Sequence, residues 1–400
     1  MKNINFILTL FVTISFSEKR IPAEWETQEA VWMQWPMQIE HWYREEFGEI
    51  IATIQDFQSV HIIVQNNNQQ NQAQNYINNN GGNSNNLTFH IQSHENAWLR
   101  DNGPVWIEEN NELIIQNMIF DGWGGAVNDF DSDNQIPCIM ANWLDLPCEN
   151  LDFIMERGNM EFNGAGDMLI NWDCWNDRNP HYSEAQSDAI LMEAFGVTNV
   201  VWTYGHSPYD ITKGHIDGVA RFINETTVAV SQYVDAKDEE AWIADDAATA
   251  ISSADFDVVR IDMPGYINYW GYEIPAIYMN WLQINDAIIG NAYGVASWDN
   301  MAQQQIENLF PGYEVILIET PEVNVGGGGI HCITNDQPLF IPSTTIAGDI
   351  NEDGLINVID VVQVVQLILS EDFNSIADMN NDNQLNVIDV VQLVNIILGN

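Results

Sequence analysis

Residues 326–338 read GGGGIHCITNDQP and carry the most informative pattern in the chain. Cys332 follows a run of four glycines after two intervening residues. Because glycine has no side chain, such a run lets the backbone approach a ligand closely. A lone cysteine in this setting suggests a nucleophile, although a small buried hydrophobic residue is the ordinary alternative. In an extended segment His331 would point away from Cys332, so we leave His331 outside the predicted site.

Three segments nearer the N-terminus carry matching acidic and basic groups. Asp101 lies in WLRDNGP at residues 98–104, and Glu156 precedes the turn sequence RGN. His215 and Asp217 lie two residues apart in GHIDGVARF, and in an extended strand they would point to the same side. With Cys332 these segments supply a thiol, a histidine and three carboxylates.

This set of groups is suited to the hydrolysis of a guanidine. A guanidinium is a planar cation rich in N–H donors, and carboxylates bind it through paired hydrogen bonds. A thiolate can attack its central carbon, and the bound positive charge favours the thiolate form. A histidine can protonate the departing ammonia and then activate water. Alone, an acid is usually a cap and a histidine usually structural, but the combination indicates catalysis.

Six ordered motifs resemble those of the agmatine deiminase family, which includes the bacterial peptidylarginine deiminases. They are PAEWE at 22–26, WLRDNGP at 98–104, GWGG at 122–125, DRNP at 177–180, GHIDGVARF at 214–222 and GGGGIHCITNDQP at 326–338. The resemblance covers nearly all of residues 22–342, which we take as the catalytic domain. It implies an α/β fold of the pentein type, a five-bladed α/β-propeller of ββαβ-type units around a central active site.

The resemblance also implies a role for each residue. Cys332 is the expected nucleophile that forms an amidino-thioether, His215 the general acid/base, and Glu156 the acid that supports His215. The expected substrate-binding residues are Asp101 and Asp217, which hold the guanidinium nitrogens, together with Asn280, Trp98 and Trp123, which line the pocket. No metal or organic cofactor is needed for this chemistry.

Agmatine, giving N-carbamoylputrescine and ammonia as in putrescine biosynthesis, is the substrate that the motifs favour. Peptidyl arginine, giving peptidyl citrulline, is the alternative. Arg157 stands where the family usually has glycine, Gly329 where agmatine-specific members have asparagine, and Asn335-Asp336 where they have two glutamines. Two hypotheses from other functional classes are open. One is an inactive calcium-dependent adhesion or scaffold protein, in which Cys332 is unreactive. The other is a thiol protease, which would leave the carboxylates without a role.

Short β-rich runs alternate with amphipathic helical patterns between residues 23 and 342, which predicts an α/β chain. The predicted strands are 60–64, 87–91, 113–115, 199–202, 227–230, 256–261 and 314–318. The predicted helices are 41–57, 183–195, 239–252 and 300–309. We interpret the Asn/Gln-rich segment 65–86 as a polar surface loop around a short helix.

After a short linker at 343–347, residues 348–400 contain two near-identical segments offset by 29 residues (378 minus 349). Each places oxygen ligands at loop positions 1, 3, 5, 9 and 12, which suits a calcium ion. The expected ligands are Asp349, Asn351, Asp353, Asn357 and Asp360 in the first loop, and Asp378, Asn380, Asp382, Asn386 and Asp389 in the second. Apolar helices are predicted to follow at 361–369 and 390–398.

This doubled loop and helix resembles the dockerin type I module of bacterial extracellular complexes. The resemblance implies a small helical domain that folds on Ca²⁺, with two sites, and docks onto a cohesin-like partner. The alternative is a calcium clip that only stabilises the protein.

The N-terminal segment indicates the compartment of the protein, and its net charge limits the classes of partner. Lys2 and the apolar run 6–16 predict a signal peptide at 1–17, so we expect a secreted, extracellular protein; a buried strand is the alternative. A net charge of −47, which adaptation to salty water would also explain, excludes nucleic acid and anionic lipid as partners. No other stretch is apolar enough to span a membrane.

Cys138 and Cys148 are candidates for a disulfide, although the sequence alone does not show that they pair. We place Cys174 in the core.

Overall fold

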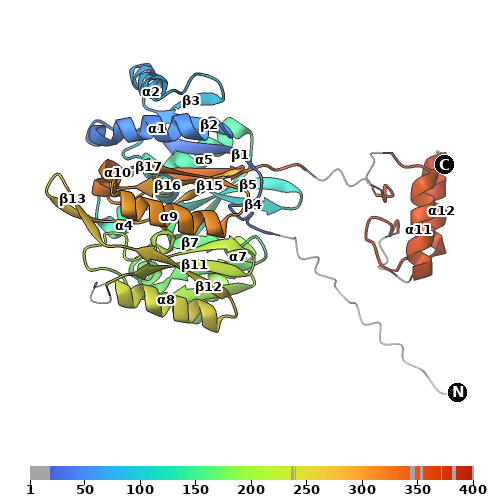
Figure 1. Cartoon of the computed structure of the whole chain (residues 1–400). Coiled ribbons are helices and arrows are strands. Elements are labelled where there is room, and N and C mark those ends of the chain that lie inside the picture. Colours follow the sequence, from blue (N-terminus) through green and yellow to red (C-terminus); the bar gives the residue numbers. More distant parts are fainter. Residues whose placement is uncertain are drawn as a thin grey trace. The chain divides into compact units, whose positions relative to one another are not determined.

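The computed structural model describes residues 19–235, 238, 240–342, 347–351, 355–370, 372–380 and 384–398 (Figure 1). The chain divides into two compact units, Met1–Phe340 and Ile341–Asn400. The predicted signal peptide at 1–17 lies outside the described residues, as do residues 343–346 of the predicted linker. Within the described ranges, every helix is too short or too polar to cross a bilayer.

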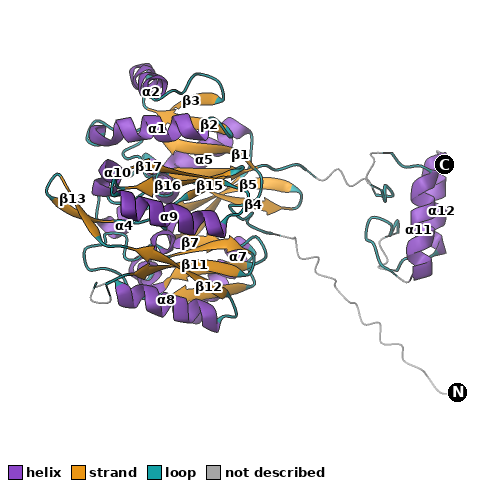
Figure 2. Ribbon diagram, viewed as in Figure 1, coloured by secondary structure: helices purple, strands orange, loops and turns teal. Residues whose placement is uncertain are grey.

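Five sheets of the larger unit share one pairing pattern, in which a middle strand has one antiparallel and one parallel neighbour (Figure 2). Tight turns join the antiparallel pairs, as at Asn110 and Asn111, which both have positive φ angles of 52° and 62°. The parallel pairs need longer crossovers, and these contain the helices. One of the five differs in that no turn joins its antiparallel pair: the antiparallel partner of β1 comes from the far end of the unit, where Val31 pairs with Asp336.

The strands, sheet by sheet, have the following bounds: β18 Thr334–Pro338, β1 Gln28–Gln34, β2 Ser59–Val64 and β3 Leu87–Ile91; β4 Val105–Glu109, β5 Glu112–Ile119 and β6 Cys148–Ile154; β7 Met160–Phe162, β8 Asp167–Asn171 and β9 Asn199–Thr203; β10 Ala220–Asn224, β11 Thr227–Tyr233 and β12 Asp257–Met263; β15 Leu282–Ile284, β16 Ala287–Ala292 and β17 Glu314–Glu319. A separate hairpin consists of β13 Tyr266–Tyr269 and β14 Tyr272–Pro275.

The helices of this unit are α1 Arg44–Ile54, α2 Asn67–Asn79, α3 Leu99–Asn102, α4 Gly122–Gly125, α5 Ile136–Leu144, α6 Trp172–Arg178, α7 Glu184–Phe195, α8 Ala241–Ser253, α9 Ala296–Leu309 and α10 Pro321–Gly326. Four 3-10 turns complete it: η1 His41–Tyr43, η2 Asp133–Gln135, η3 Arg157–Asn159 and η4 Ile216–Gly218.

Five apolar clusters connect these sheets in order. One cluster joins β1 and β2 to β4 and β5, and the next joins β4 to β7, β8 and helices α6 and α7. The third joins β8 and β9 to β10 and β11, and the fourth joins β11 and β12 to β16 and β17. The last joins β15 and β16 back to β1, β2 and α1. Each sheet therefore shares buried apolar surface with the sheet before it and the sheet after it.

The predicted strands all coincide with observed strands to within a few residues, and the unit is a mixed α/β structure. The prediction for residues 65–86 underestimated the helix, since α2 has 13 residues. Asn66 caps it by accepting hydrogen bonds from the backbone N–H groups of Asn68 and Gln69. Only Ala73 and Ile77 of α2 are buried, so its apolar stripe is too narrow to stand out in the sequence.

Cys138 and Cys148 form a disulfide that links the start of α5 to the start of β6. Sequence spacing left this pairing open, because separation along the chain does not fix the distance between two Cβ atoms. Cys174 is a buried free thiol, as predicted.

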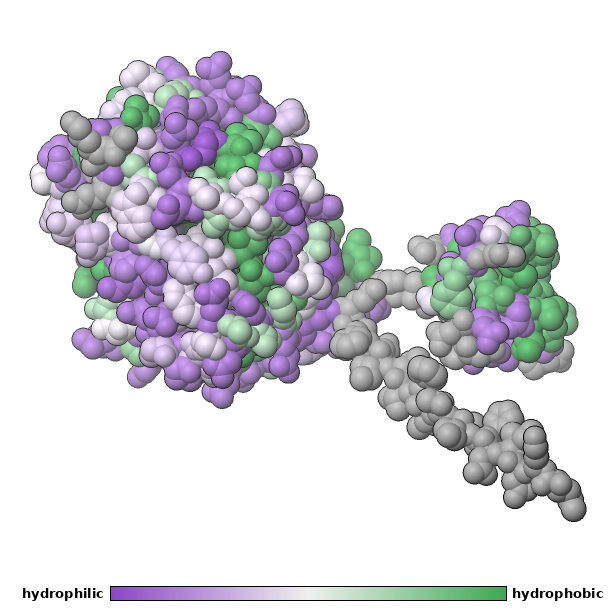
Figure 3. Space-filling view, turned by 90° about the horizontal axis from the view of Figure 1, so that it is seen from below, coloured by the Kyte–Doolittle hydropathy of each residue, from purple (hydrophilic) through white to green (hydrophobic). Residues whose placement is uncertain are grey.

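The smaller unit contains α11 Val358–Ser370 and α12 Val387–Leu398 around a core of Val364, Ala377 and Leu393. Both helices begin three residues earlier than predicted, which places Asp360 and Asp389 in their first turns. Figure 3 shows apolar side chains gathered on the exposed surface of this unit. They come from both helices and include Val358, Ile359, Val362, Val387, Ile388 and Val391.

Candidate active site

Cys332 lies in the turn between α10 and β18, and its thiol faces two polar side chains. Its Sγ is 3.4 Å from Oδ1 of Asn280 and 3.5 Å from Oδ2 of Asp217. The backbone N–H of Cys332 also donates to Oδ1 of Asn280 at 3.3 Å. Asn280 therefore holds both the backbone and the thiol of the predicted nucleophile.

His215 and Asp217 do not lie on an extended strand, the geometry that we considered for residues two apart. Ile216–Gly218 is the 3-10 turn η4, and His215 directly precedes it. Both side chains still line the same cavity as Cys332, because the turn, rather than a two-residue periodicity, presents them there. Nδ1 of His215 is 3.4 Å from Oδ1 of Asp101, and Nε2 is 3.4 Å from Oε2 of Glu156.

Asp101 is buried on the short helix α3, and one of its two carboxylate oxygens is satisfied. Nε1 of Trp123 donates to its Oδ2 at 2.8 Å, whereas Oδ1 accepts no hydrogen bond from any described residue. Burial raises the pKa of Asp101 to about 6, assisted by the charge of Asp217 and opposed by His215 and Trp123. A carboxylate with an unused buried oxygen is a ready acceptor for a cationic ligand.

Glu156 lies behind His215 and is fully buried. Its Oε1 accepts from Nε of Arg178 at 3.0 Å, and its Oε2 is 3.5 Å from the thiol of Cys174. Arg157, which replaces a family glycine, points elsewhere: its guanidinium donates to the carbonyl of Met160 and lies 5.2 Å from the ring centroid of Phe162. The substitution therefore leaves Glu156 beside His215.

Gly158 is the position where this loop needs a glycine. A Cβ atom there would lie 2.5 Å from Oδ1 of Asp101 and 2.6 Å from Nδ1 of His215. Any larger residue would push these two side chains apart.

One cavity of about 1120 Å³ gathers seven of the eight predicted site residues. They are Trp98, Asp101, Trp123, His215, Asp217, Asn280 and Cys332, while Glu156 supports His215 from behind. No lysine or arginine is found among the described residues that line this cavity, whereas several acids are. The cavity is therefore suited to a cationic ligand.

The protonation states follow from burial and charge. Burial raises the pKa of the Cys332 thiol well above its usual value, and the charges of Asp217 and Asp101 raise it further. Burial disfavours the imidazolium of His215, but attraction to Asp101 and hydrogen bonds outweigh it and raise the pKa of His215. At neutral pH these shifts favour a protonated Cys332 thiol, a His215 imidazolium and ionised carboxylates.

His331 is a site residue that the sequence prediction left out. Because residues 330–333 form a turn and not a strand, His331 does not point away from the site. Its Nδ1 is 2.7 Å from Oδ2 of Asp217, the same oxygen that faces Cys332, and its Nε2 is 3.1 Å from Oε2 of Glu24. Glu24 also pairs with Arg221, whose Nε lies 2.7 Å from Oε1 of Glu161. Glu24 and Arg221 occur in the motifs at 22–26 and 214–222, and this was the only feature of the sequence that could have assigned them to the site.

The C-terminal loops fit calcium by the chemistry of their donor sets. Asp349, Asp360, Asp378 and Asp389 are all buried, and residues 347–398 contain no lysine, arginine or histidine to balance them. The carboxylate of Asp360 accepts backbone N–H bonds from Ile350, Asn351 and Asn357, and Asp389 accepts the equivalent bonds from Met379 and Asn386. Of the ten predicted ligands, Asp353 and Asp382 lie outside the described residues. Carboxylate and amide oxygens in a unit without basic residues are the donor set that Ca²⁺ prefers.

Comparisons with known proteins agree with both units. The sequence model of the family described as Porphyromonas-type peptidyl-arginine deiminase matches residues 20–338, and that of the dockerin type I domain matches residues 347–398. An agmatine deiminase of Medicago truncatula is 26% identical over 380 residues, covering 82% of this chain and 98% of the relative.

Solved structures give the same result for the fold. The agmatine deiminase of Enterococcus faecalis superposes with a TM-score of 0.74 at 26% identity, covering 81% of this chain and 97% of the other. A substrate-bound variant of the agmatine deiminase of C. jejuni superposes with a TM-score of 0.74 at 24% identity, over 85% of this chain and 99% of the other.

Proposed function

Because the chain belongs to the Porphyromonas-type peptidyl-arginine deiminase family and carries a dockerin type I domain, we propose that it is a hydrolase of guanidine C–N bonds whose substrate is agmatine. The observation that carries the proposal is the single cavity shared by Cys332, His215, Asp101 and Asp217. The names of the relatives and the absence of basic side chains among the described lining residues support agmatine, which has a cation at each end.

The proposed reaction has two halves. The guanidinium lies between Asp101 and Asp217, and its charge promotes loss of the Cys332 proton to solvent. The thiolate attacks the central carbon, the His215 imidazolium gives its proton to the departing nitrogen, and the C–N bond breaks to release ammonia. Neutral His215 then takes a proton from water, and the hydroxide adds to the amidino-thioether. The C–S bond breaks as the hydroxyl proton of this adduct passes to the sulfur, which leaves N-carbamoylputrescine and the Cys332 thiol.

Peptidyl arginine is the second candidate substrate, and the size of the cavity favours it. A volume of about 1120 Å³ exceeds what a molecule of nine non-hydrogen atoms can fill. Ammonia release from agmatine, and from a peptide with an internal arginine and blocked ends, decides between the two. Release from neither substrate would reject both.

We propose that the five sheets are the blades of an α/β-propeller. The common pairing pattern and the closed succession of apolar clusters, in which the last sheet packs on the first, support this arrangement. A closed ring leaves no sheet at the end of the series with an uncovered apolar face.

The remaining proposals concern the whole chain. We propose a catalytic domain at 22–342, a linker at 343–347 and a calcium-loaded dockerin domain at 348–400. The exposed apolar side chains of α11 and α12 support a cohesin-like partner for this domain, and such a partner supports export through a signal peptide at 1–17. N-terminal sequencing of protein recovered from the culture medium tests the cleavage after residue 17.

Asp217→Asn and Asp101→Asn are each expected to lower kcat/KM for agmatine by about 30-fold to 5,000-fold. Removing one partner of a buried, hydrogen-bonded charge pair costs about 2–5 kcal/mol, and here the lost partner is a carboxylate for the guanidinium. Initial rates of ammonia release measure the effect. Asp246→Asn, which removes an exposed acid on α8, is the matched control for the change in net charge. Equal rates in all three variants would contradict the proposed binding mode.

The pH dependence of kcat/KM is expected to show an acid limb near pH 6, the pKa of Asp101. Below that pH the carboxyl is protonated and neutral, so it no longer attracts the guanidinium, and kcat/KM falls about tenfold per pH unit. Trp123→Phe removes the N–H donor that favours the ionised form, so the limb should move to higher pH. Trp98→Phe, which removes an indole of the same cavity whose N–H makes no hydrogen bond to Asp101 in the described part of the chain, should leave the limb in place. A limb that stays put or moves down in Trp123→Phe would exclude Asp101 as its origin.

A further inference from the structure

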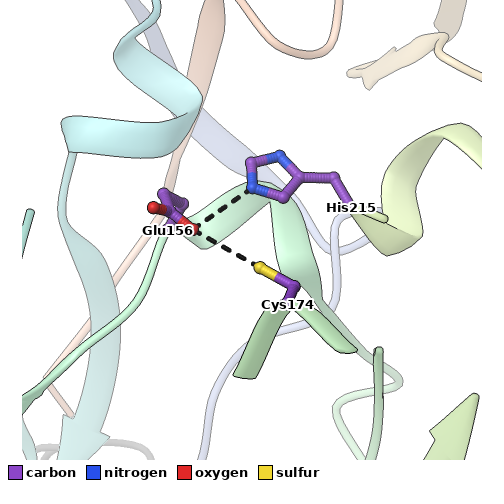
Figure 4. Close-up of side chains that lie close together, drawn as sticks. All are labelled: Glu156, Cys174 and His215. Atoms are coloured by element: carbon purple, nitrogen blue, oxygen red, sulfur yellow. Dashed lines mark hydrogen bonds and ion pairs between the residues drawn. The ribbon is translucent and has the colours of Figure 1, made fainter. Parts of the chain in front are cut away.

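Behind the cavity wall, Glu156, Cys174 and His215 converge from three separate segments (Figure 4). Glu156 precedes η3, Cys174 is on α6, and His215 precedes η4. Oε2 of Glu156 is the common point, 3.4 Å from Nε2 of His215 and 3.5 Å from Sγ of Cys174. All three potential ligand atoms lie within 4.8 Å of one another. The proposed reaction uses His215 and Glu156, but it gives the buried thiol of Cys174 no task.

The spacing of these atoms is that of metal ligands. Around a tetrahedral Zn²⁺, with bonds of about 2.0–2.2 Å to nitrogen and oxygen and about 2.3 Å to sulfur, neighbouring ligand atoms lie about 3.3–3.7 Å apart. Both measured separations fall in this range. A thiolate and an imidazole also select Zn²⁺ over Ca²⁺ or Mg²⁺, which prefer oxygen ligands only.

The surroundings of the three residues leave the necessary atoms available. Arg178 binds Oε1 of Glu156 and so leaves Oε2 for a metal. Nδ1 of His215 faces Oδ1 of Asp101, which accepts no other bond among the described residues. A histidine that binds a metal through one nitrogen typically donates from the other to a carboxylate, and Asp101 is placed to accept it. Glu156 and Cys174 are fully buried, and the three residues supply three of the four positions of a tetrahedral ion.

A second group of similar composition, Glu24, Glu161 and His331, lacks these properties. Arg221 lies between its two carboxylates and pairs with both. Its contact with Glu24 is to Oε2, the same oxygen that faces His331. The guanidinium therefore already occupies the position that a metal would take.

We propose that Glu156, Cys174 and His215 form a Zn²⁺ site, and that Zn²⁺ bound there inhibits the enzyme. Zn²⁺ replaces the thiol proton of Cys174 and the Nε2 proton of His215, and both protons pass to solvent. With Nε2 held by the metal, His215 can neither protonate ammonia nor activate water. The inhibition rests on the proposed deiminase function, whereas the binding does not.

Co²⁺ binding to the Cys332→Ser protein tests the site without reference to activity. Cys174 is then the sole free thiol, because Cys138 and Cys148 are joined. With the full-length protein saturated in Ca²⁺, Co²⁺ should produce a thiolate-to-metal charge-transfer absorption, which the oxygen ligands of the C-terminal loops cannot give. The absorption should vanish in Cys332→Ser/Cys174→Ser. No absorption in the single variant, or its persistence in the double variant, would overturn the proposal.

X-ray absorption of the Zn²⁺-loaded Cys332→Ser protein provides a second readout if the double variant fails to fold. One sulfur at about 2.3 Å with nitrogen and oxygen ligands at about 2.0–2.2 Å is expected. A first shell without sulfur would equally refute the site.

Inhibition is measured as the Zn²⁺ concentration that halves ammonia release in the presence of Ca²⁺. Cys174→Ala, referred to its own zinc-free rate, should need more than about tenfold more Zn²⁺, since even the loss of a supporting partner costs about 10–100-fold in metal affinity. Equal sensitivity would place the inhibitory zinc elsewhere and refute the inhibition. If the wild-type protein hydrolyses neither substrate, the proposed function fails, while the Co²⁺ absorption still decides the site.

Discussion

Cys332→Ser is expected to lower kcat for agmatine hydrolysis by at least about 10⁴-fold, because the loss of a hydrolase nucleophile removes covalent catalysis altogether. Serine keeps the size of the side chain, so the contacts to Asn280 and Asp217 can remain. Its hydroxyl, however, does not ionise in a buried position between two carboxylates. Ammonia release measured at high enzyme concentration checks the result, and more than about 1% residual activity would be incompatible with Cys332 as the nucleophile.

Two controls separate a chemical effect from a folding effect. The variant retains Asp101 and Asp217, so agmatine should still raise its thermal midpoint as it does for the wild-type protein. In the wild-type protein, a cationic haloacetamidine should alkylate Cys332 much faster than neutral iodoacetamide, because the cation lies between the carboxylates and favours the thiolate. Mass mapping distinguishes Cys332 from Cys174, whose pKa burial raises to about 12. Labelling that agmatine does not block would argue against a guanidine site.

Removal of calcium is expected to unfold the C-terminal unit and leave the catalytic unit intact. Each site contributes about 4 kcal/mol when calcium exceeds its Kd by 1,000-fold, and two sites together rival the stability of a small domain. Without the ion, the buried acids repel each other, and the unit has no basic residue to offset them. Its core of Val364, Ala377 and Leu393 is too small to compensate.

Chymotrypsin in EGTA measures this unfolding, because the unit has no lysine or arginine for trypsin. Cleavage at Phe373 and at the leucines of α11 and α12 should appear in EGTA and disappear when calcium is restored. The double variant Asp349→Ala/Asp378→Ala should be cleaved even with calcium. Asp372→Asn, an exposed acid of the same unit, should behave as wild type. Protection that persists in EGTA would mean that the unit folds without the metal. Ammonia release should not change in EGTA.

Local patterns in the sequence predicted much of this molecule. The two calcium loops repeat within 29 residues, so their ligand spacing and following helices are visible without any tertiary information. Several strands are also visible locally, since apolar β-branched runs such as 60–64 favour the extended conformation on a buried sheet. Fully buried β16 gave no alternating signal and was missed, because both of its faces are covered.

The motifs predicted the residues of the cavity and the support of His215 by Glu156, but not the other contacts between them. Asn280, His215 and Asp101 take their distances to Cys332 and to one another from loops that belong to different sheets. The segment 214–222 supplied a motif without a predicted strand, and in the structure a 3-10 turn presents His215 and Asp217 before β10 begins at Ala220. A turn and a strand end differ only in a few backbone angles, which the side chains at these positions do not determine.

The sequence by itself determined which chemical groups the chain possesses, in what order, and that its last part repeats a loop with the oxygen-ligand spacing of a calcium site. Only the tertiary structure decided which groups meet. His331 contacts Asp217 across 114 residues and Glu24 across 307, and Cys174 reaches Glu156 and His215 from another helix. Contacts between such distant residues depend on how whole sheets pack, and packing depends on the apolar surfaces of every element together, which no local spacing encodes.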